Sequence, residues 1–380
     1  MLLGKIYGIF VDISELNSLF FQAEVVYFTI TNNMETKMLW NSETGVVTGE
    51  TGMFLGKNVV RLLFPAEKIL KVYNSTLGTV YEAGKDFTHE SGSDLLYVTA
   101  DTGIPVLPEE ALYPPPEKSI LFPDPDANAI AGGPDGKNLI FSRKNFFAAH
   151  QVEIDYQAAA GTVFPDNPTL KEGQLPRFTS LLKAGKNVSI TLIGDSISAG
   201  SNSTKQMDCP PYAPPYIETV AAGLEKRFGG KVEVRNSAIG GTGCRQAFDI
   251  EDTWLDKPCD LLIIAYGMND FAHMSGADYK ETLKKIIDKM HAAHPETEFL
   301  LVTSMTGNPN WRSTVAGPDV IFAEELRTLA SDTVAVADVR PFWVKILERK
   351  DFYDMTGNGV NHPNDHGYRV YAKVFLDLFR

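Results

Sequence analysis

The chain has 380 residues, of which 44% are hydrophobic and 22% charged, and its formal net charge is −13. This composition is typical of a globular protein of two or three domains. The acidic balance argues against partnership with nucleic acid or an anionic membrane surface, and no apolar run reaches the about 18 residues that a membrane-spanning helix needs.

The first residues and the cysteines both bear on the compartment. Lys5 interrupts the apolar start of the chain, Asp12 ends it, and no small-residue cleavage site follows, so the segment is a poor signal peptide. Cys209, Cys244 and Cys259 include no Cys-x-x-Cys pair, which indicates neither a disulfide framework nor a zinc site. We therefore expect a cytoplasmic protein.

Residues 1–170 have the pattern of an all-β domain. Apolar or alternating runs are separated by turn residues such as Gly45, Gly49 and Gly52. The predicted strands cover residues 24–30, 58–64, 69–73, 94–99, 138–141 and 151–156. We expect a β-sandwich, with the Pro- and Gly-rich segment 103–136 as a surface excursion rather than a lid over a substrate.

From about residue 178 to residue 380 the pattern changes to strands that alternate with helices. The predicted strands are residues 188–193, 232–235, 260–266, 298–303 and 333–337. The predicted helices are residues 215–227, 277–293, 318–330 and 366–378. This alternation predicts a parallel, doubly wound α/β sheet, whose ligands bind beyond the carboxyl ends of the strands.

Four polar blocks stand at or near these strand ends, and their chemistry is complementary. They occupy residues 194–200, 236–243, 267–270 and 361–367. Acyl transfer needs a nucleophile, a base and donors for the developing oxyanion. Ser196 supplies a hydroxyl and His362 a base, while the backbone N–H groups of Ser196 and Gly241 and the side-chain amide of Asn269 supply three donors.

In this order, the four blocks resemble the SGNH branch of the GDSL hydrolases over residues 178–380, with Ser196, Gly241, Asn269 and His362 at the four named positions. The resemblance implies a flavodoxin-like three-layer α/β/α domain with a five-stranded parallel sheet. It also implies serine esterase activity without cofactor or metal, in an open site suited to short acyl esters, often acetyl groups on carbohydrate. The two-part layout is similar to carbohydrate esterases that carry an N-terminal jelly-roll module.

One position departs from the family pattern. Three residues before the histidine the family usually has an aspartate that orients the imidazole, and here Gly359 stands there. A backbone carbonyl near Gly359 is the favoured substitute, which would leave a Ser-His dyad. Asp354 or another acid from elsewhere in the chain is a second possibility, and a catalytically crippled domain is a third.

A metal site is the rival interpretation of the histidine block. His362, Asp365 and His366 have ligand-like spacing, but Pro363 and Gly367 argue against both histidines lying in one regular helix. We therefore expect no metal, and we expect Asp365 to cap the last helix instead.

The sequence favours a serine esterase that acts on a small-molecule or oligosaccharide ester. Tyr212, Tyr216 and Trp311 are candidates for stacking on a sugar, and residues 201–215 are placed to line the pocket. A degenerate glycan-binding module and an acyltransferase on the same scaffold remain as alternatives. Nothing in the sequence indicates an oligomer.

Overall fold

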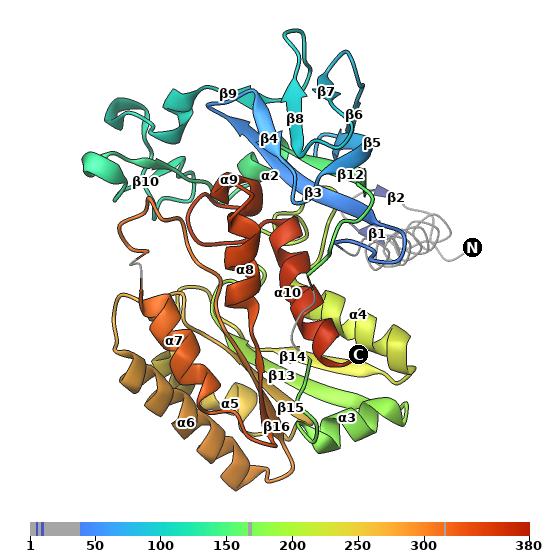
Figure 1. Cartoon of the computed structure of the whole chain (residues 1–380). Helices are drawn as coiled ribbons and strands as arrows, with labels where there is room; N and C mark the ends of the chain where they lie inside the picture. Colours follow the sequence, from blue (N-terminus) through green and yellow to red (C-terminus); the bar gives the residue numbers. More distant parts are fainter. Residues whose placement is uncertain (1–4, 7–8, 11–38, 166–168, 315–316) are drawn as a thin grey trace.

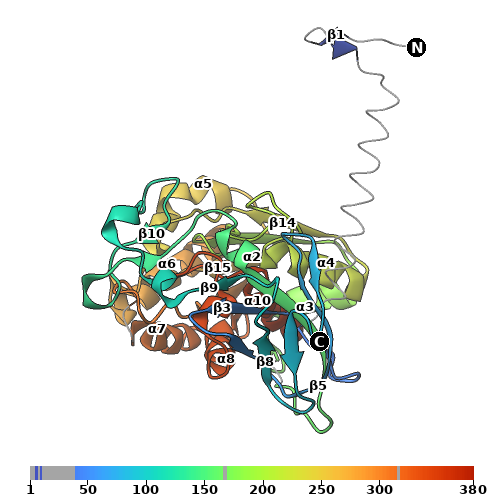
Figure 2. The ribbon, with the colours of Figure 1, turned by 90° about the horizontal axis from the view of Figure 1, so that it is seen from above.

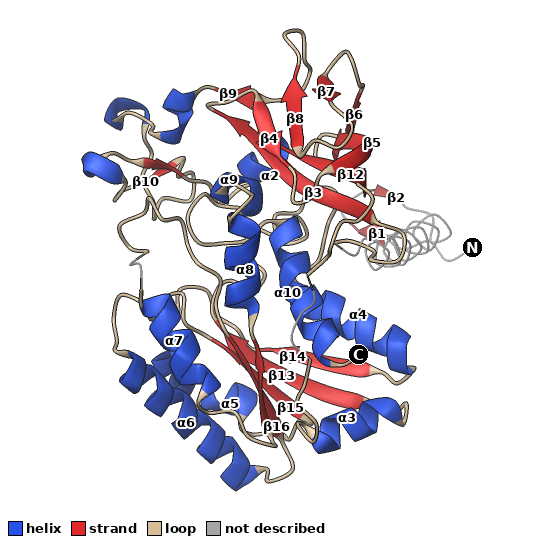
Figure 3. Cartoon of the chain, in the orientation of Figure 1, coloured by secondary structure: helices blue, strands red, loops and turns tan. Residues whose placement is uncertain are grey.

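The computed structural model describes residues 5–6, 9–10, 39–165, 169–314 and 317–380. A β-rich N-terminal part lies above an α/β C-terminal part in the view of Figures 1 and 3. The strand predicted over residues 24–30 lies outside the described residues. Within these ranges, no helix combines the length and the apolar character needed to cross a bilayer.

The C-terminal part is built on one sheet. Its strands are β13 (Val188–Gly194), β14 (Val232–Asn236), β15 (Leu261–Ala265), β16 (Glu298–Val302) and β17 (Val334–Ala337). They lie in the order β14-β13-β15-β16-β17, and every neighbouring pair is parallel. All residues of β15 and β16 are buried, as expected for central strands covered on both faces.

Helices cover both faces of this sheet (Figures 1 and 3). Helix α4 (Tyr216–Phe228) packs against α10 (Asp365–Leu378) on one face, and α6 (Gly276–Ala293) packs against α7 (Pro318–Arg327) on the other. The remaining helices are α3 (Pro176–Lys183), the 3₁₀ helix η4 (Cys244–Ile250), α5 (Glu251–Trp254), α8 (Val339–Leu347) and α9 (Phe352–Met355). The predicted α/β character of this part is confirmed.

The N-terminal part holds two larger sheets and some short pairs. One sheet has the order β6-β5-β12-β3-β9 and the other β4-β8-β7. The strands are β1 (Lys5–Ile6), β2 (Ile9–Phe10), β3 (Val46–Leu55), β4 (Val59–Arg61), β5 (Ala66–Asn74), β6 (Thr79–Tyr81), β7 (Phe87–His89), β8 (Leu95–Val98), β9 (Val106–Leu107), β10 (Ala129–Ile130), β11 (Leu139–Ile140) and β12 (Gln151–Ala158). The helices are η1 (Glu109–Leu112), η2 (Pro116–Lys118), η3 (Pro134–Gly136) and α2 (Phe146–His150). That the sheets form a jelly-roll-like sandwich stays a prediction, as do the domain limits at residues 170 and 178.

The glycines near residue 50 do not all mark turns. Gly49 and Gly52 lie inside the ten-residue strand β3, so the prediction of turns at these two positions is wrong. A Cβ on Gly49 would lie 2.9 Å from the Arg369 guanidinium, and one on Gly52 would lie 3.1 Å from Val60. Glycine at these two positions therefore allows the Arg369 and Val60 side chains to pack closely against the strand, and it does not mark a turn.

The two parts of the chain pack on one another through β3, which contacts α9 and α10. Strand β3 lies close to α10 in Figures 1 and 2. A buried ion pair lies at this junction: Lys350 Nζ is 2.9 Å from Glu50 Oε1, and both side chains are fully buried. Tyr156 donates to the other Glu50 oxygen at 2.7 Å, and Lys350 also donates to the Arg61 carbonyl at 2.6 Å. The buried charge of Lys350 in the C-terminal part thus has its partners Glu50 and Arg61 in the N-terminal part.

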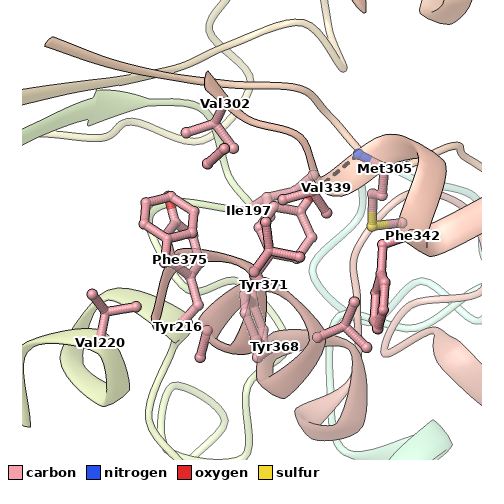
Figure 4. Packing of buried hydrophobic residues seen from close by; sticks show 14 of the residues in the cluster. Ile197, Tyr216, Val220, Val302, Met305, Val339, Phe342, Tyr368, Tyr371 and Phe375 are labelled. Carbon is pink, nitrogen blue, oxygen red and sulfur yellow. Dashed lines mark hydrogen bonds between the residues drawn. The ribbon is translucent and has the colours of Figure 1, made fainter. Parts of the chain in front are cut away.

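An apolar cluster supports the loop that follows β13. Ile197 is 3% exposed and packs near Tyr371, which with Phe375 projects from α10 (Figure 4). The Tyr371 hydroxyl accepts a hydrogen bond from the Met305 backbone N–H at 3.0 Å. The residue after Ser196 is thus anchored in the core, which fixes the loop that carries the hydroxyl.

Candidate active site

Ser196 lies in a tight turn at the carboxyl end of β13. Asp195 closes the turn, because its Oδ1 accepts a hydrogen bond from the Ile197 backbone N–H at 2.9 Å. The preceding Gly194 has no room for a side chain, since a Cβ there would lie 2.6 Å from the Ala265 carbonyl oxygen. The Gly-Asp-Ser sequence therefore folds as a close-packed turn, and Ser196 itself is 6% exposed.

His362 reaches Ser196 from the loop between α9 and α10. Its Nε2 lies 2.8 Å from Ser196 Oγ, which is hydrogen-bond distance. The loop is shaped by Asn358, whose Oδ1 accepts from the backbone N–H groups of Val360, Asn361 and His362, each at 3.0 Å. The structure thus brings together the two residues that the sequence analysis proposed as nucleophile and base.

A third side chain completes the arrangement, and the sequence analysis did not name it. Asn202 Oδ1 lies 2.7 Å from His362 Nδ1. The Asn202 amide nitrogen faces the Ser142 carbonyl oxygen at 3.4 Å, and since a carbonyl only accepts, the amide oxygen must face the imidazole. His362 Nδ1 then carries the proton, and Nε2 is left as the acceptor for the Ser196 hydroxyl.

Asn202 belongs to the segment 201–215, which the sequence analysis placed beside the pocket. Its backbone has φ +65°, in the left-handed region that asparagine tolerates better than most residues. An asparagine in a loop has many ordinary explanations, so the only available signal was its place soon after the nucleophile.

Both orienting groups that the sequence offered are placed elsewhere. The Gly359 carbonyl accepts from Asn308 Nδ2 at 2.8 Å, so the favoured interpretation, that this carbonyl orients His362, is wrong. Asp354 is buried at the junction, where it accepts from the Met53 backbone N–H at 2.7 Å, so the alternative of Asp354 is also wrong. An amide side chain replaces the usual carboxylate.

The geometry of Gly359 explains why no aspartate occupies that position. Its φ is +90°, and a Cβ would lie 2.5 Å from the Ile140 carbonyl oxygen and 2.8 Å from the Phe147 ring. Residues of the N-terminal part therefore fill the space that an aspartate would need. The glycine reflects this packing rather than decay of the site.

The N-terminal part also holds the histidine loop in place. Gln151 of β12 donates to the carbonyls of Tyr353 and Thr356 at 2.8 and 2.9 Å, and its oxygen accepts from Asn364 at 3.0 Å. The Ser142 backbone N–H donates to the Asn358 carbonyl at 3.3 Å. The position of His362 thus depends on contacts from both parts of the chain.

The charge on His362 is controlled by its surroundings. Burial lowers its pKa to about 4, and the positive charge of Arg143 acts in the same direction. The imidazole is consequently neutral at pH 7, as a general base must be before it takes a proton. For Asp195, burial raises the pKa to about 7. Its Oδ1 accepts from the Ile197 backbone N–H, while His362 Nδ1 faces Asn202.

Two of the three predicted oxyanion donors, Gly241 and Asn269, line one cavity. A Cβ on Gly240 would be 3.6 Å from Ser196 Cβ, so the turn that holds Gly241 lies against the nucleophile. Among the described residues, neither the Ser196 nor the Gly241 backbone N–H has an acceptor. Asn269 donates one amide hydrogen to the Thr242 carbonyl at 2.9 Å, which leaves the other free. Their role as an oxyanion hole stays a prediction.

A cavity of about 400 Å³ opens beside these donors. Gly241, Asn269, Asn361 and Trp311 are among the residues that line it, and most of the lining side chains are polar. Trp311 is half-buried, and its indole N–H donates to the Ala131 carbonyl at 3.1 Å.

The two tyrosines proposed for sugar stacking lie apart from this cavity. Tyr216 is fully buried, with its hydroxyl 2.9 Å from Ser198 Oγ, so its proposed role in stacking is wrong. Tyr212 is 42% exposed and is not among the lining residues. Of the three aromatic candidates, only Trp311 lies in a position to contact a substrate there.

The residues considered for a metal site have other partners. Asn364 caps α10, since its Oδ1 accepts from the Gly367 backbone N–H at 2.9 Å, so the prediction that Asp365 is the cap is wrong. Asp365 instead accepts from the backbone N–H and hydroxyl of Thr204 at 2.9 and 2.6 Å. His366 is buried, and its pKa is lowered by burial and by Arg369.

Comparison with known proteins gives a family match for part of the chain. Residues 192–370 match the model of the GDSL-like lipase/acylhydrolase family. A two-domain esterase active on acetylated mannans is 24% identical, with a TM-score of 0.43, over 56% of this chain and 54% of its own, so this chain spans about half the length of that protein. A comparison with curated proteins gives no match.

Two other solved structures are similar over nearly their whole length. A putative GDSL-like lipase from Parabacteroides merdae is 20% identical, with a TM-score of 0.43, over 52% of this chain and 98% of its own. An acetylxylan esterase from Geobacillus stearothermophilus is 17% identical, with a TM-score of 0.40, over 52% and 96%. The predicted resemblance to ester hydrolases is confirmed over residues 192–370, the part of the chain that matches the GDSL-like lipase/acylhydrolase family model.

Proposed function

We propose that this protein is a serine esterase that hydrolyses short acyl esters, with O-acetyl groups on carbohydrate as the preferred substrates. The observation that carries the proposal is the 2.8 Å contact between Ser196 Oγ and His362 Nε2. Neither residue lines the cavity, but Asn361, the neighbour of His362, and two of the predicted oxyanion donors, Gly241 and Asn269, do. A neutral imidazole at this distance accepts the hydroxyl proton as the oxygen attacks.

The reaction then follows in two balanced steps. Ser196 Oγ bonds to the ester carbon, its proton passes to His362 Nε2, and the alcohol leaves with that proton as its C–O bond breaks. Water attacks the acyl-enzyme in the same way and restores Ser196. The backbone N–H groups of Ser196 and Gly241 and the Asn269 amide hold the negative oxygen in both steps, and each such donor contributes about 3 kcal/mol.

Asn202 acts as the positioning residue for this base. By accepting from Nδ1–H it selects the tautomer whose Nε2 is free, as the carboxylate does in a Ser-His-Asp triad. The alternative of a degenerate binding module was based on the missing aspartate at position 359, and Asn202 supplies that missing function.

The cavity supports a carbohydrate ester in preference to a lipid. Its lining is rich in amide and hydroxyl groups, among them Gln246, Asn269, Ser313 and Asn361. Trp311 offers an aromatic surface in the same cavity, and such surfaces pack against the apolar faces of sugars. A long acyl chain would find few apolar partners there.

Turnover of acetylated sugars by the wild type and by Ser196→Ala tests the proposal. We expect the wild type to release acetate and Ser196→Ala to lose nearly all of this activity with an unchanged unfolding temperature. Acetylated sugars should be cleaved more efficiently than esters of eight or more acyl carbons. A folded wild type that cleaves no ester, or a Ser196→Ala variant that retains full activity, would contradict it.

A further inference from the structure

Three arginines near the site differ from the other nine in the chain, all of which are described. Six of those nine pair with carboxylates and three donate to backbone or threonine oxygens. They are Arg61, Arg177, Arg327, Arg340, Arg349 and Arg380, and Arg227, Arg235 and Arg369. Within the described part of the chain, the side chains of Arg143, Arg245 and Arg312 have neither an ion pair nor a hydrogen bond, and all three are exposed.

These three arginines come from separate segments, and each lies in or next to a segment that contributes to the cavity or to the histidine loop. Arg245 lines the cavity itself. Arg312 stands between Trp311 and Ser313, which both line the cavity. Arg143 follows Ser142, which contacts Asn202 and the histidine loop, and its charge acts on His362.

Acidic groups do not offset this positive charge inside the cavity. Among the lining residues, the carboxyl-bearing one is Asp270, which is 5% exposed and whose pKa is raised by burial. The chain as a whole carries a net charge of −13 and repels anions at long range. Arg245, whose charge also acts on Asp270, therefore places an exposed positive charge at a cavity of this otherwise acidic chain.

We propose that the substrate is anionic: an acyl ester of a saccharide whose carboxylate is bound by Arg245, with Arg143 and Arg312 adding to the positive field. This inference rests on the proposed function and narrows its substrate class to acylated acidic sugars. A guanidinium presents two parallel N–H groups that match a carboxylate, and one without an internal partner is available for that contact. We place the carboxylate on the sugar because Arg245 lines the same cavity as Trp311, the aromatic surface proposed to contact the sugar.

Two pairs of esters measure whether a carboxylate on the substrate raises kcat/KM and whether that carboxylate must lie on the sugar or on the acyl group. The first pair is the O-acetylated methyl glycosides of glucuronic acid and of glucose, which differ in charge on the sugar. The second pair is the 4-nitrophenyl hemisuccinate and butyrate, which both have four acyl carbons and differ in charge on the acyl group. We expect the wild type to favour the acetylated glucuronide in kcat/KM, and Arg245→Gln to lower the charged-to-neutral ratio about tenfold.

A control variant separates local from overall charge. Lys85→Gln removes one positive charge from the turn between β6 and β7, where Lys85 is 65% exposed. It should leave the ratio unchanged. High salt should reduce the wild-type preference, because the three arginines are exposed and their fields are screened.

The outcomes separate this inference from the proposed function. A wild type that cleaves both sugar acetates equally well overturns the inference and leaves the esterase intact. Preference for the hemisuccinate alone overturns the assignment of the carboxylate to the sugar. If no ester is cleaved, titration of the glucuronide and the glucoside into the protein still decides: tighter glucuronide binding that Arg245→Gln abolishes supports the anion site, and equal binding refutes it.

Discussion

Replacing Asn202 by aspartate tests how His362, the proposed base, is held. In the wild type a neutral amide oxygen accepts from His362 Nδ1 at 2.7 Å, while burial and Arg143 keep the imidazole pKa at about 4. The substitution keeps the shape of the side chain and suits the left-handed backbone at this position, where φ is +65°. It adds a negative charge next to the ring, which stabilises the imidazolium.

The expected shift follows from that charge. A carboxylate in contact with a titrating group moves its pKa by about one to three pH units toward the charged form. The base works only when neutral, so activity is lost as pH falls through its pKa. The acidic limb of kcat/KM should therefore move upward from about pH 4 to between about 5 and 7 in Asn202→Asp. Asn202→Gly instead removes the acceptor without backbone strain, and it should lower kcat about 5-fold to 150-fold, which corresponds to an unsatisfied Nδ1–H.

The assay is acetate release from an acetylated sugar between about pH 3.5 and 8, with thermal unfolding as the check on folding. The two variants should differ in kind, with a displaced pH profile for Asn202→Asp and a uniformly reduced rate for Asn202→Gly. A folded Asn202→Asp variant whose acidic limb stays in place would refute the assignment of Asn202 as the partner of His362. Full activity of Asn202→Gly would do the same.

Three further predictions concern the framework of the site. Glu50→Ala leaves the buried Lys350 without its 2.9 Å partner and should lower the free energy of unfolding by about 3–5 kcal/mol. Adding Lys350→Met to this variant should restore much of the lost stability. Equal losses in the single and the double variant, measured by chemical denaturation, would contradict the prediction. Gly359→Ala should lower the free energy of unfolding by at least about 1 kcal/mol more than the control Gly78→Ala, because both glycines have positive φ but only Gly359 is crowded. Equal denaturation midpoints of the two variants would count against the packing argument. For Asp195, the folded pKa of about 7 exceeds the ordinary value, so the folded state retains a proton that the unfolded state releases, and wild-type stability falls as pH rises from about 4 to 7. Asp195→Asn should remove this dependence, and its stability relative to the wild type should increase over that range; a constant difference would disprove it.

The sequence was most informative in the C-terminal part. Buried strands there are short apolar runs followed directly by polar blocks, so the pattern located β13 and β15 to within a residue or two and placed Ser196 at the end of its strand. The order of the blocks then indicated the family. His362 was recognisable for the same reason, since its loop directly precedes the amphipathic α10.

The sequence was less informative where tertiary contacts decide the structure. Strand β3 contains Gly49 and Gly52, which favour turns in a local reading, but Arg369 and Val60 pack where their side chains would be. Arg369 belongs to α10 and Val60 to β4, so neither contact can be predicted from the sequence around the two glycines. Tyr216 was misread for a related reason, because a tyrosine near the nucleophile can face either the pocket or the core.

The missing aspartate and the presence of Asn202 have one physical cause. The Ile140 carbonyl and the Phe147 ring lie where a side chain at position 359 would begin, so the usual direction of approach to the imidazole is closed. His362 Nδ1 is reached instead from the segment after the nucleophile, and the adjacent Ser142 carbonyl orients the Asn202 amide. The N-terminal part thus excludes one orienting group and fixes its replacement. It follows that residues 139–147 and Asn202 form one functional unit, and that changes at position 359 alone cannot restore an acidic triad.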